Sequence, residues 1–185
     1  QKDGLVNSFD QEAMGVLADL CASEYQITRE EQDEFALDSQ KKAELAWANG
    51  HFDSQIAPVT VKSRKGNVVV DRDEHMRPQT TLEGLAKLPG VFAKENGTVT
   101  PGNASGITDG AAALVLMSAD EAERRGITPL AEFLDSQTAG TDPKRMGLGP
   151  VPATAQLFER NGWSFDDFGL FELNEAFAAQ ALACL

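Results

Sequence analysis

The sequence has no long apolar run and no secretory pattern at its start. No stretch of about 18 consecutive apolar residues occurs, which excludes a membrane-spanning helix and predicts no membrane partner. The first ten residues, QKDGLVNSFD, do not place a basic segment before an apolar one, so we expect a protein that is not secreted. The chain also begins without Met, which predicts that it was processed, trimmed or excised.

Cysteine and histidine are scarce, with two of each. Two cysteines are too few for a disulfide framework, and Cys21 and Cys184 both lie among apolar residues of expected helices. This favours small core residues, in the cytoplasm or another reducing compartment, over catalytic nucleophiles. His51 and His75 stand alone in polar segments, so no metal site is expected.

The net charge of −13 argues against a nucleic-acid partner. Residues 62–87 nevertheless hold six basic and four acidic side chains. Two interpretations of this basic stretch stay open: a solvated hairpin that happens to be basic, or a surface that attracts an anionic small molecule. Its basic residues are Lys62, Arg64, Lys65, Arg72, Arg77 and Lys87.

The first hundred residues predict an irregular α+β region. Apolar residues at helical spacing predict a helix over residues 13–25 and another from Thr28, where Thr28 and Glu31 form a capping box, to Gly50 as its C-terminal cap. Two β-rich runs around residues 65–67 predict a hairpin, and a short helix is expected near residues 82–88.

From Thr100 onward, the pattern changes to strands that alternate with helices. We expect buried strands at residues 112–117 and 129–140, and a third from residue 168 that leads into a final helix. Helices are expected over residues 118–126 and 151–162. This alternation predicts an α/β fold with a layered sheet.

A glycine-rich segment, TPGNASGITDGAA, covers residues 100–112. Gly102, Ala104, Ser105, Gly106 and Gly110 leave its backbone almost without side chains, which suits a tight turn or the close approach of a ligand. The segment lacks the lysine of a P-loop and the spacing of the dinucleotide fingerprint, so nucleotide binding of those kinds is disfavoured.

Several segments, taken together, resemble the thiolase family of acyl-CoA acyltransferases, which includes acetyl-CoA acetyltransferases and 3-ketoacyl-CoA thiolases. The resemblance covers essentially all 185 residues and is carried by KDGL with MG nine residues on, ITREEQDEFALDSQKKAELAWANGHF, RKGNVVVDRDEHMRP, TPGNASGITDGAAALVLMS, DPKRMGLGPVPA and LNEAFAAQAL. It implies a thiolase-like α/β/α fold in layered portions plus an α+β coenzyme-binding loop domain. The implied bounds are 1–106 for the loop domain, 107–126 for the end of the N-terminal α/β domain, and 127–185 for the start of the C-terminal one.

The resemblance also implies a function. Thiolases make or cleave 3-ketoacyl-CoA by passing an acyl group through a cysteine acyl-enzyme, while oxyanion holes stabilise the developing charges. Coenzyme A and acyl-CoA are substrates, no cofactor is bound permanently, and the family forms homo-oligomers, dimers or tetramers.

Five residues match positions along the pantetheine arm of coenzyme A in the family. Ser105 and Ala104 resemble residues that contact this arm, where small side chains admit a narrow chain and a hydroxyl can bond an amide. Leu5, Met14 and Phe92 fall where apolar residues flank the arm or the acyl group.

Four further residues match the two ends of the ligand. Arg77 falls where an arginine approaches the adenine nucleotide, which would give the basic stretch a purpose. Asn174 resembles the asparagine that positions a water in an oxyanion hole, although it could also serve as the N-cap of the final helix. Ala176 and Phe177 would line the pocket near the thioester.

The chain departs from the family pattern in its catalytic residues. In the family, the nucleophilic cysteine lies before the segment that matches Gln1, and the histidine of Gly-His-Pro and a second cysteine lie after the segment that matches Leu185. The resemblance therefore implies an interior portion that is inactive by itself. Many family members have a histidine before the methionine and Thr-Ala-Glu after the glycine, whereas this chain reads Glu12-Ala13-Met14-Gly15 and continues with Val16-Leu17-Ala18-Asp19. This leaves the acyl-chain preference and part of the coenzyme contact open. The alternative is a non-catalytic coenzyme A-binding or interaction protein on a thiolase scaffold.

Overall fold

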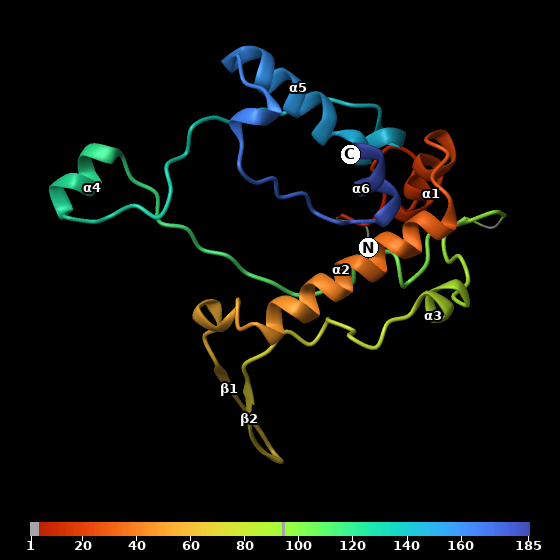
Figure 1. Ribbon diagram of the computed structural model, residues 1–185, viewed down its shortest axis with the longest axis horizontal. Helices are drawn as coiled ribbons and strands as arrows, with labels where there is room; N and C mark the ends of the chain where they lie inside the picture. The colour runs from red at the N-terminus through yellow and green to blue at the C-terminus, as the bar shows by residue number, and fades with distance from the viewer. Residues whose placement is uncertain (1–3, 94) are drawn as a thin grey trace. The chain divides into compact units, whose positions relative to one another are not determined.

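The computed structural model describes residues 4–93 and 95–185, which form two compact units (Figure 1). Unit 1 runs through Gly106 and also includes Thr141–Leu148 and Glu172–Leu185, whereas unit 2 comprises Ile107–Gly140 and Gly149–Phe171. No helix within the described ranges is both long and apolar enough to cross a membrane.

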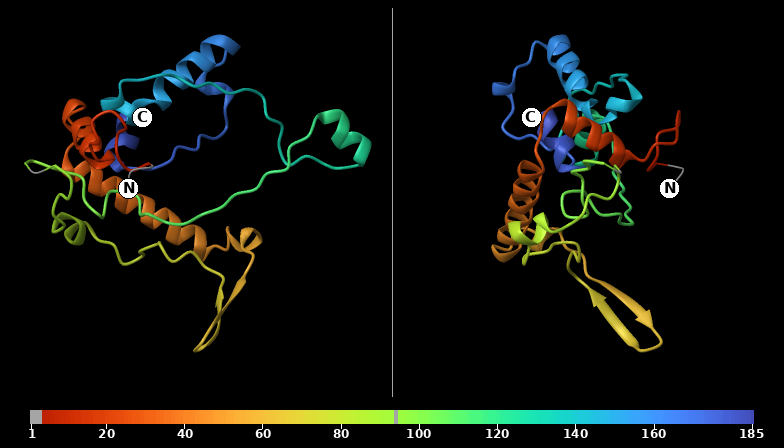
Figure 2. Two further views of the ribbon diagram at one scale, coloured as in Figure 1. Left: turned by 180° about the vertical axis from the view of Figure 1, so that it is seen from behind. Right: turned by 90° about the vertical axis from the view of Figure 1, so that its right-hand side faces the viewer.

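Unit 1 is built around two packed helices, α1 (Met14–Glu24) and α6 (Ala178–Cys184). The 3₁₀ segment η2 (Pro143–Leu148) packs on both, and α2 (Arg29–Ala48) contacts α6 and α3 (Leu82–Ala86) (Figures 1 and 2). The interior is made of small apolar side chains, which let the helices approach closely. Buried members of this core are Leu17, Ala18, Ala22, Val99, Ala178, Ala179 and Ala181.

The ends of α2 confirm the predicted signals. The Thr28 side chain accepts a hydrogen bond from the Glu31 amide, and the Glu31 carboxylate accepts one from the Thr28 amide, which completes the capping box. After the helix, Gly50 adopts a φ of 71°, a left-handed conformation that glycine reaches without strain. The predicted helices near residues 13–25 and 82–88 are also present as α1 and α3.

The predicted hairpin is formed by β1 (Val59–Ser63) and β2 (Gly66–Val70), which pair antiparallel from Val59 opposite Val70 to Ser63 opposite Gly66. Every residue of both strands is exposed, and Figure 2 shows the hairpin projecting from the rest of unit 1. It follows the 3₁₀ turn η1 (Asp53–Gln55). After the hairpin, the Arg72 guanidinium lies 5.2 Å from the ring centroid of Trp47, so part of the basic stretch is attached to α2.

Unit 2 contains α4 (Ala119–Arg125), α5 (Pro150–Asn161) and the 3₁₀ turn η3 (Phe165–Asp167). Both α-helices end at glycines in the left-handed conformation, Gly126 and Gly162, as predicted. Aromatic rings of α5, η3 and the residue after η3 pack together, with centroid distances of 5.1 Å for Phe158–Phe165 and 5.2 Å for Phe158–Phe168. This cluster joins α5 to η3, and its Phe165 remains 66% exposed.

The three strands predicted after Thr100 are wrong as strands. Residues 4–93 and 95–185 contain one ladder, β1–β2, and residues 112–117, 129–140 and 168–173 have no regular secondary structure. Leu114, Val115 and Leu116 are 82–87% exposed. An apolar run becomes a strand only where a neighbouring strand pairs with its backbone, and these segments have no such neighbour among the described residues.

Candidate functional site

The glycine-rich segment and the NEAF segment are joined by backbone pairing. The Ser105 amide donates to the Ala176 carbonyl at 3.0 Å, and the Ala178 amide donates to the Asn103 carbonyl at 2.9 Å. Ala104 and Phe177 face each other between these bonds as an isolated antiparallel bridge. We refer to residues 103–105 and 176–178 as the 104–177 bridge. It brings together four predicted site residues, Ala104, Ser105, Ala176 and Phe177, from segments that lie far apart in the sequence.

A pair of aromatic rings extends this group. The rings of Phe92 and Phe177 meet edge to face, with centroids 6.2 Å apart and planes at 86°. Phe92 lies directly against the backbone of Gly15 in α1, where an added Cβ would stand 2.2 Å from the Phe92 ring. Glycine is therefore required at this contact, and it fixes where Phe92 meets Phe177.

Met14 is the first residue of α1, and Leu5 lies in the segment that precedes the helix. The Met14 amide donates to the Leu5 carbonyl at 3.1 Å, so the two backbones are held together. Met14 also lines a hollow of about 360 Å³ with Val6, Phe9 and Met146. This volume lies in the usual range for small-molecule sites, about 300–1,000 Å³, and its walls combine these apolar side chains with polar Asn7, Ser8 and Thr141.

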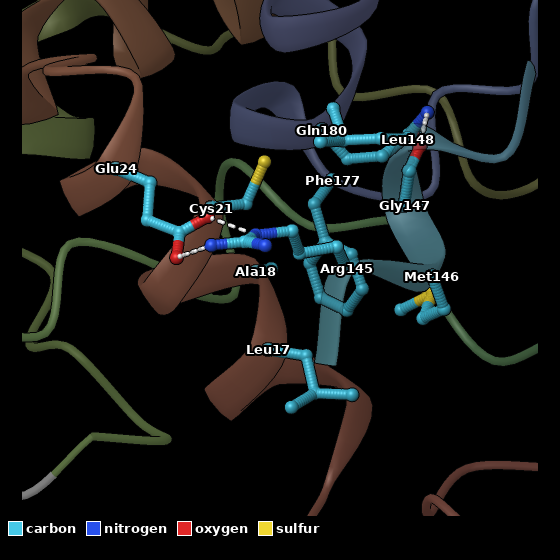
Figure 3. A pocket seen from close by; sticks show the side chains of 10 residues that line it. All are labelled: Leu17, Ala18, Cys21, Glu24, Arg145, Met146, Gly147, Leu148, Phe177 and Gln180. Atoms are coloured by element: carbon cyan, nitrogen blue, oxygen red, sulfur yellow. Dashed lines mark hydrogen bonds and ion pairs between the residues drawn. The ribbon is translucent and has the colours of Figure 1, made fainter. Parts of the chain in front are cut away.

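Phe177 borders a second, smaller cavity, shown in Figure 3. Its volume of about 10 Å³ has room for about one water molecule. Its walls include Cys21, Gln180 and the ion pair between Arg145 and Glu24, whose Nε–Oε2 distance is 2.8 Å. The hydrogen bond from Arg145 lowers the pKa of Glu24. This cavity is too small for a substrate.

A buried carboxylate holds the loop that carries Phe92. Asp19 of α1 accepts from the amides of Ala93 at 3.1 Å, Thr98 at 2.7 Å and Val99 at 2.9 Å. Asp19 is 9% exposed and Val99 is fully buried. The loop therefore depends on one acidic side chain for three of its backbone bonds. The sequence signal for this role was a lone acidic residue between Ala18 and Leu20 on an apolar helix.

Arg77 lies in an exposed segment that is anchored to α2. Its backbone amide donates to Gln40 Oε1 at 2.7 Å, while its guanidinium forms no ion pair with any residue in the described part of the chain. His75, two residues earlier, packs on the backbone of Gly106, where an added Cβ would lie 2.0 Å from the imidazole. This contact ties the start of the Arg77 segment to the end of the glycine-rich segment.

Asn174 is exposed and does not cap the final helix, so the capping alternative is wrong. The N-cap of α6 is Phe177, because residues 176 and 177 are held extended by the 104–177 bridge and the helix starts only afterwards. The neighbouring Glu175 accepts from the Ser39 hydroxyl at 2.7 Å.

Neither cysteine is activated as a nucleophile. Burial raises the pKa of Cys21, with smaller contributions from Cys184 and Glu24, and burial also raises the pKa of Cys184. Both are free thiols, and the Cys184 thiol donates to the Gly147 carbonyl at 3.3 Å. Both thiols therefore remain protonated at neutral pH. Within residues 4–93 and 95–185, no three His, Cys, Asp or Glu side chains gather as metal ligands would.

Comparison with known families decides the relationship. Residues 1–120 match the thiolase N-terminal domain, and residues 127–185 match the thiolase C-terminal domain. The chain belongs to the thiolase family. The two matches together span most of the sequence, which confirms the resemblance inferred from its motifs.

Thiolase relatives are similar over nearly the whole chain. An acetyl-CoA acetyltransferase of Paracoccus denitrificans is 53% identical over 182 residues, which are 98% of this chain and 46% of the relative. The crystal structure of the Bacillus anthracis acetyl-CoA acetyltransferase superposes with a TM-score of 0.92 at 48% identity, covering 97% of this chain and 45% of that one. Human mitochondrial 3-ketoacyl-CoA thiolase gives a TM-score of 0.91 at 45% identity, covering 99% of this chain and 46% of that one. The α/β thiolase fold class is thus confirmed, and the chain spans about half the length of these relatives.

Proposed function

We propose that the chain supplies the coenzyme A-binding part of an acyl-CoA acyltransferase that makes or cleaves 3-ketoacyl-CoA. The observation that carries this proposal is the 104–177 bridge, because it holds small and apolar residues of two distant segments side by side. Ser105 and Ala104 contact the pantetheine arm, and Ala176 and Phe177 lie near the thioester. The exposed amide of Asn174 completes an oxyanion hole that stabilises the developing negative charge.

In this proposal, apolar and basic residues serve different parts of the ligand. Met14 lines the hollow of about 360 Å³, Leu5 is bonded to the Met14 backbone, and Phe92 packs on Phe177. In this proposal these three residues provide apolar contact for the arm and the acyl group. Arg77 is exposed and its guanidinium forms no ion pair within residues 4–93 and 95–185, so we propose that it attracts the phosphates of the nucleotide end. In this proposal the basic stretch serves an anionic ligand, in agreement with the second interpretation of its charge.

The same proposal assigns a role to each part of the chain. Residues 1–106 act as the coenzyme-binding loop domain, residues 107–126 as the end of the N-terminal α/β domain and residues 127–185 as the start of the C-terminal one. The raised pKa values of Cys21 and Cys184 support a nucleophile outside these residues, so the 185-residue chain alone is inactive. The whole protein works as a homo-oligomer, needs no permanently bound cofactor, and resides in the cytoplasm or another reducing compartment, which the two free thiols support.

Two measurements on the 185-residue chain test the proposal. Calorimetric titration with coenzyme A should give binding, and an absence of heat at millimolar ligand would reject it. Thiolysis of acetoacetyl-CoA should show no turnover by folded protein. Turnover that disappears in Cys21→Ala or Cys184→Ala would instead show that the chain carries its own nucleophile.

A further inference from the structure

We propose that Asp33 and Asn103 form a positioning pair, which holds the 104–177 bridge in the geometry that receives the pantetheine arm. The inference rests on the proposed coenzyme A-binding function. Neither residue is expected to touch the ligand, since Asp33 is 3% exposed and Asn103 is 4% exposed. They act through the backbone of the bridge.

Asn103 uses its whole amide to fix the turn that leads into the bridge. Its Oδ1 accepts from the Thr100 amide at 2.8 Å, and its Nδ2 donates to the Thr98 carbonyl at 3.1 Å and to Asp33 Oδ1 at 3.0 Å. Both ends of the amide are therefore satisfied in a buried site. A side chain with three bonds in fixed directions cannot rotate without leaving buried polar groups unpaired.

Asp33 connects this amide to the longest helix of unit 1. It lies in the second turn of α2, where Arg29 Nε meets Asp33 Oδ2 at 2.8 Å. The same guanidinium donates to the carbonyls of Leu85 at 2.6 Å and Leu88 at 3.0 Å. One oxygen of Asp33 thus pairs with Arg29 and the other accepts from Asn103. The carboxylate therefore fixes the turn that contains Asn103 relative to α2.

The backbone of Asn103 links this fixed turn to the 104–177 bridge. Its carbonyl accepts from the Ala178 amide, the first residue of α6, and the next two residues are the predicted ligand contacts Ala104 and Ser105. Rotation of the Asn103 peptide would break the bond to Ala178 and move the Ser105 amide away from Ala176. The Asp33–Asn103 pair is the only side-chain link from α2 to the bridge residues 103–105 within the described ranges.

The test compares Asn103→Ala with a matched control, Asn161→Ala. Asn161 Nδ2 also donates to an aspartate, Asp135, at 2.7 Å and to a backbone carbonyl, that of Leu157, at 3.0 Å, but it is exposed and belongs to unit 2. Two ligands are titrated into each variant: coenzyme A, and its nucleotide part, adenosine 3′-phosphate 5′-diphosphate, which lacks the pantetheine arm. Amide hydrogen exchange at Ala178 and Ser105 is measured in parallel.

We expect Asn103→Ala to weaken coenzyme A binding about tenfold, to leave the affinity for the nucleotide part unchanged, and to speed exchange at both amides. Asn161→Ala should change none of these quantities. A merely structural role of Asn103 would lower both affinities together, so equal losses would overturn the inference. Unchanged exchange at Ala178 and Ser105 would also overturn it.

A graded pair at Asp33 keeps the inference testable if Asn103→Ala does not fold. Asp33→Asn retains an oxygen that can accept from Asn103, whereas Asp33→Ala retains none, so coenzyme A affinity should fall less in the first variant than in the second. Equal affinities for wild type and Asp33→Ala would overturn the positioning role. If wild type binds no coenzyme A, the proposed function fails, and the exchange rates at Ala178 and Ser105 alone decide whether the pair orders the bridge.

Discussion

Removal of the Asp19 carboxylate should destabilise unit 1 strongly. In Asp19→Ala, the amides of Ala93, Thr98 and Val99 lose their acceptor, and the Val99 amide lies in a fully buried residue. A buried donor without a partner costs about 1–3 kcal/mol, and bonds to a charged acceptor lie at the upper end of this range. Because Ala93 and Thr98 are only half-buried, water can compensate part of their loss.

The expected sum for Asp19→Ala is a loss of about 3–5 kcal/mol in the free energy of unfolding, reduced by about 0.5 kcal/mol because alanine favours a helix. At about 2–4 °C per kcal/mol for a chain of this size, the midpoint of thermal unfolding should fall by about 10 °C. Urea unfolding followed by circular dichroism measures the free energy directly.

Asp38→Ala is the matched control for this prediction. Asp38 also lies on a helix, and its carboxylate meets Lys42 Nζ at 2.6 Å, but the two side chains are 59% and 77% exposed. An exposed pair of this kind contributes about 0–1 kcal/mol, so the control should be close to wild type. If Asp19→Ala destabilises no more than Asp38→Ala, the loop does not depend on the carboxylate and the reasoning is refuted.

Three further changes probe other features of unit 1. Gly15→Ala should lower the free energy of unfolding by about 1–3 kcal/mol although alanine favours a helix, because the new Cβ would lie 2.2 Å from the Phe92 ring. Adding Phe92→Leu to this variant should recover part of the lost stability. If urea unfolding shows that Gly15→Ala alone is more stable than wild type, the contact is refuted. Arg77→Ala should weaken coenzyme A binding, measured by calorimetry, about fivefold at low salt and less at high salt. The control Arg124→Ala removes an arginine that is already paired within α4 and should leave the affinity unchanged. Equal effects of the two variants would contradict a specific role of Arg77. Acid should destabilise wild type more than Glu24→Gln, because the hydrogen bond from Arg145 lowers the pKa of Glu24 in the folded protein. The stabilisation by the Glu24 carboxylate is therefore present above the pKa of the unfolded state and is lost as the pH falls through the pKa of the folded state. Identical pH profiles of urea unfolding for the two proteins would contradict this.

Local signals in the sequence were enough to predict the helices and the hairpin. The capping box of Thr28 and Glu31, the glycine after α2 and the turn between β1 and β2 each depend on residues within a few positions of one another. The strands after Thr100 were mispredicted for the opposite reason. Apolar composition reports that a segment can be buried, but a strand also needs a partner, and the pattern of residues 112–117 says nothing about whether one is present.

The thiolase motifs suggested members for the candidate site but not its geometry. The thiolase motifs pointed to Ser105, Ala176 and Phe177 individually, whereas their backbone pairing joins segments about seventy residues apart and leaves no periodic trace in the sequence. The roles of Asp19 and Asp33 were missed because each carboxylate serves backbone or side-chain groups of a distant loop. Their only local signal is an acidic residue on a buried helical face, at positions where an unpaired charge would be costly.

The separation of these contacts along the chain has a consequence for folding kinetics. Asp33 and Asn103 are 70 residues apart, Asp19 and Val99 are 80 apart, Glu24 and Arg145 are 121 apart, and Ser39 and Glu175 are 136 apart. Closing such loops costs entropy before any bond repays it, so chains rich in distant contacts fold slowly. The hairpin and the capped helix α2 can form early from local interactions. The 104–177 bridge can form only after the segments around residues 104 and 177 have come together. Competence to bind a ligand at the bridge should therefore appear in the last kinetic phase of refolding.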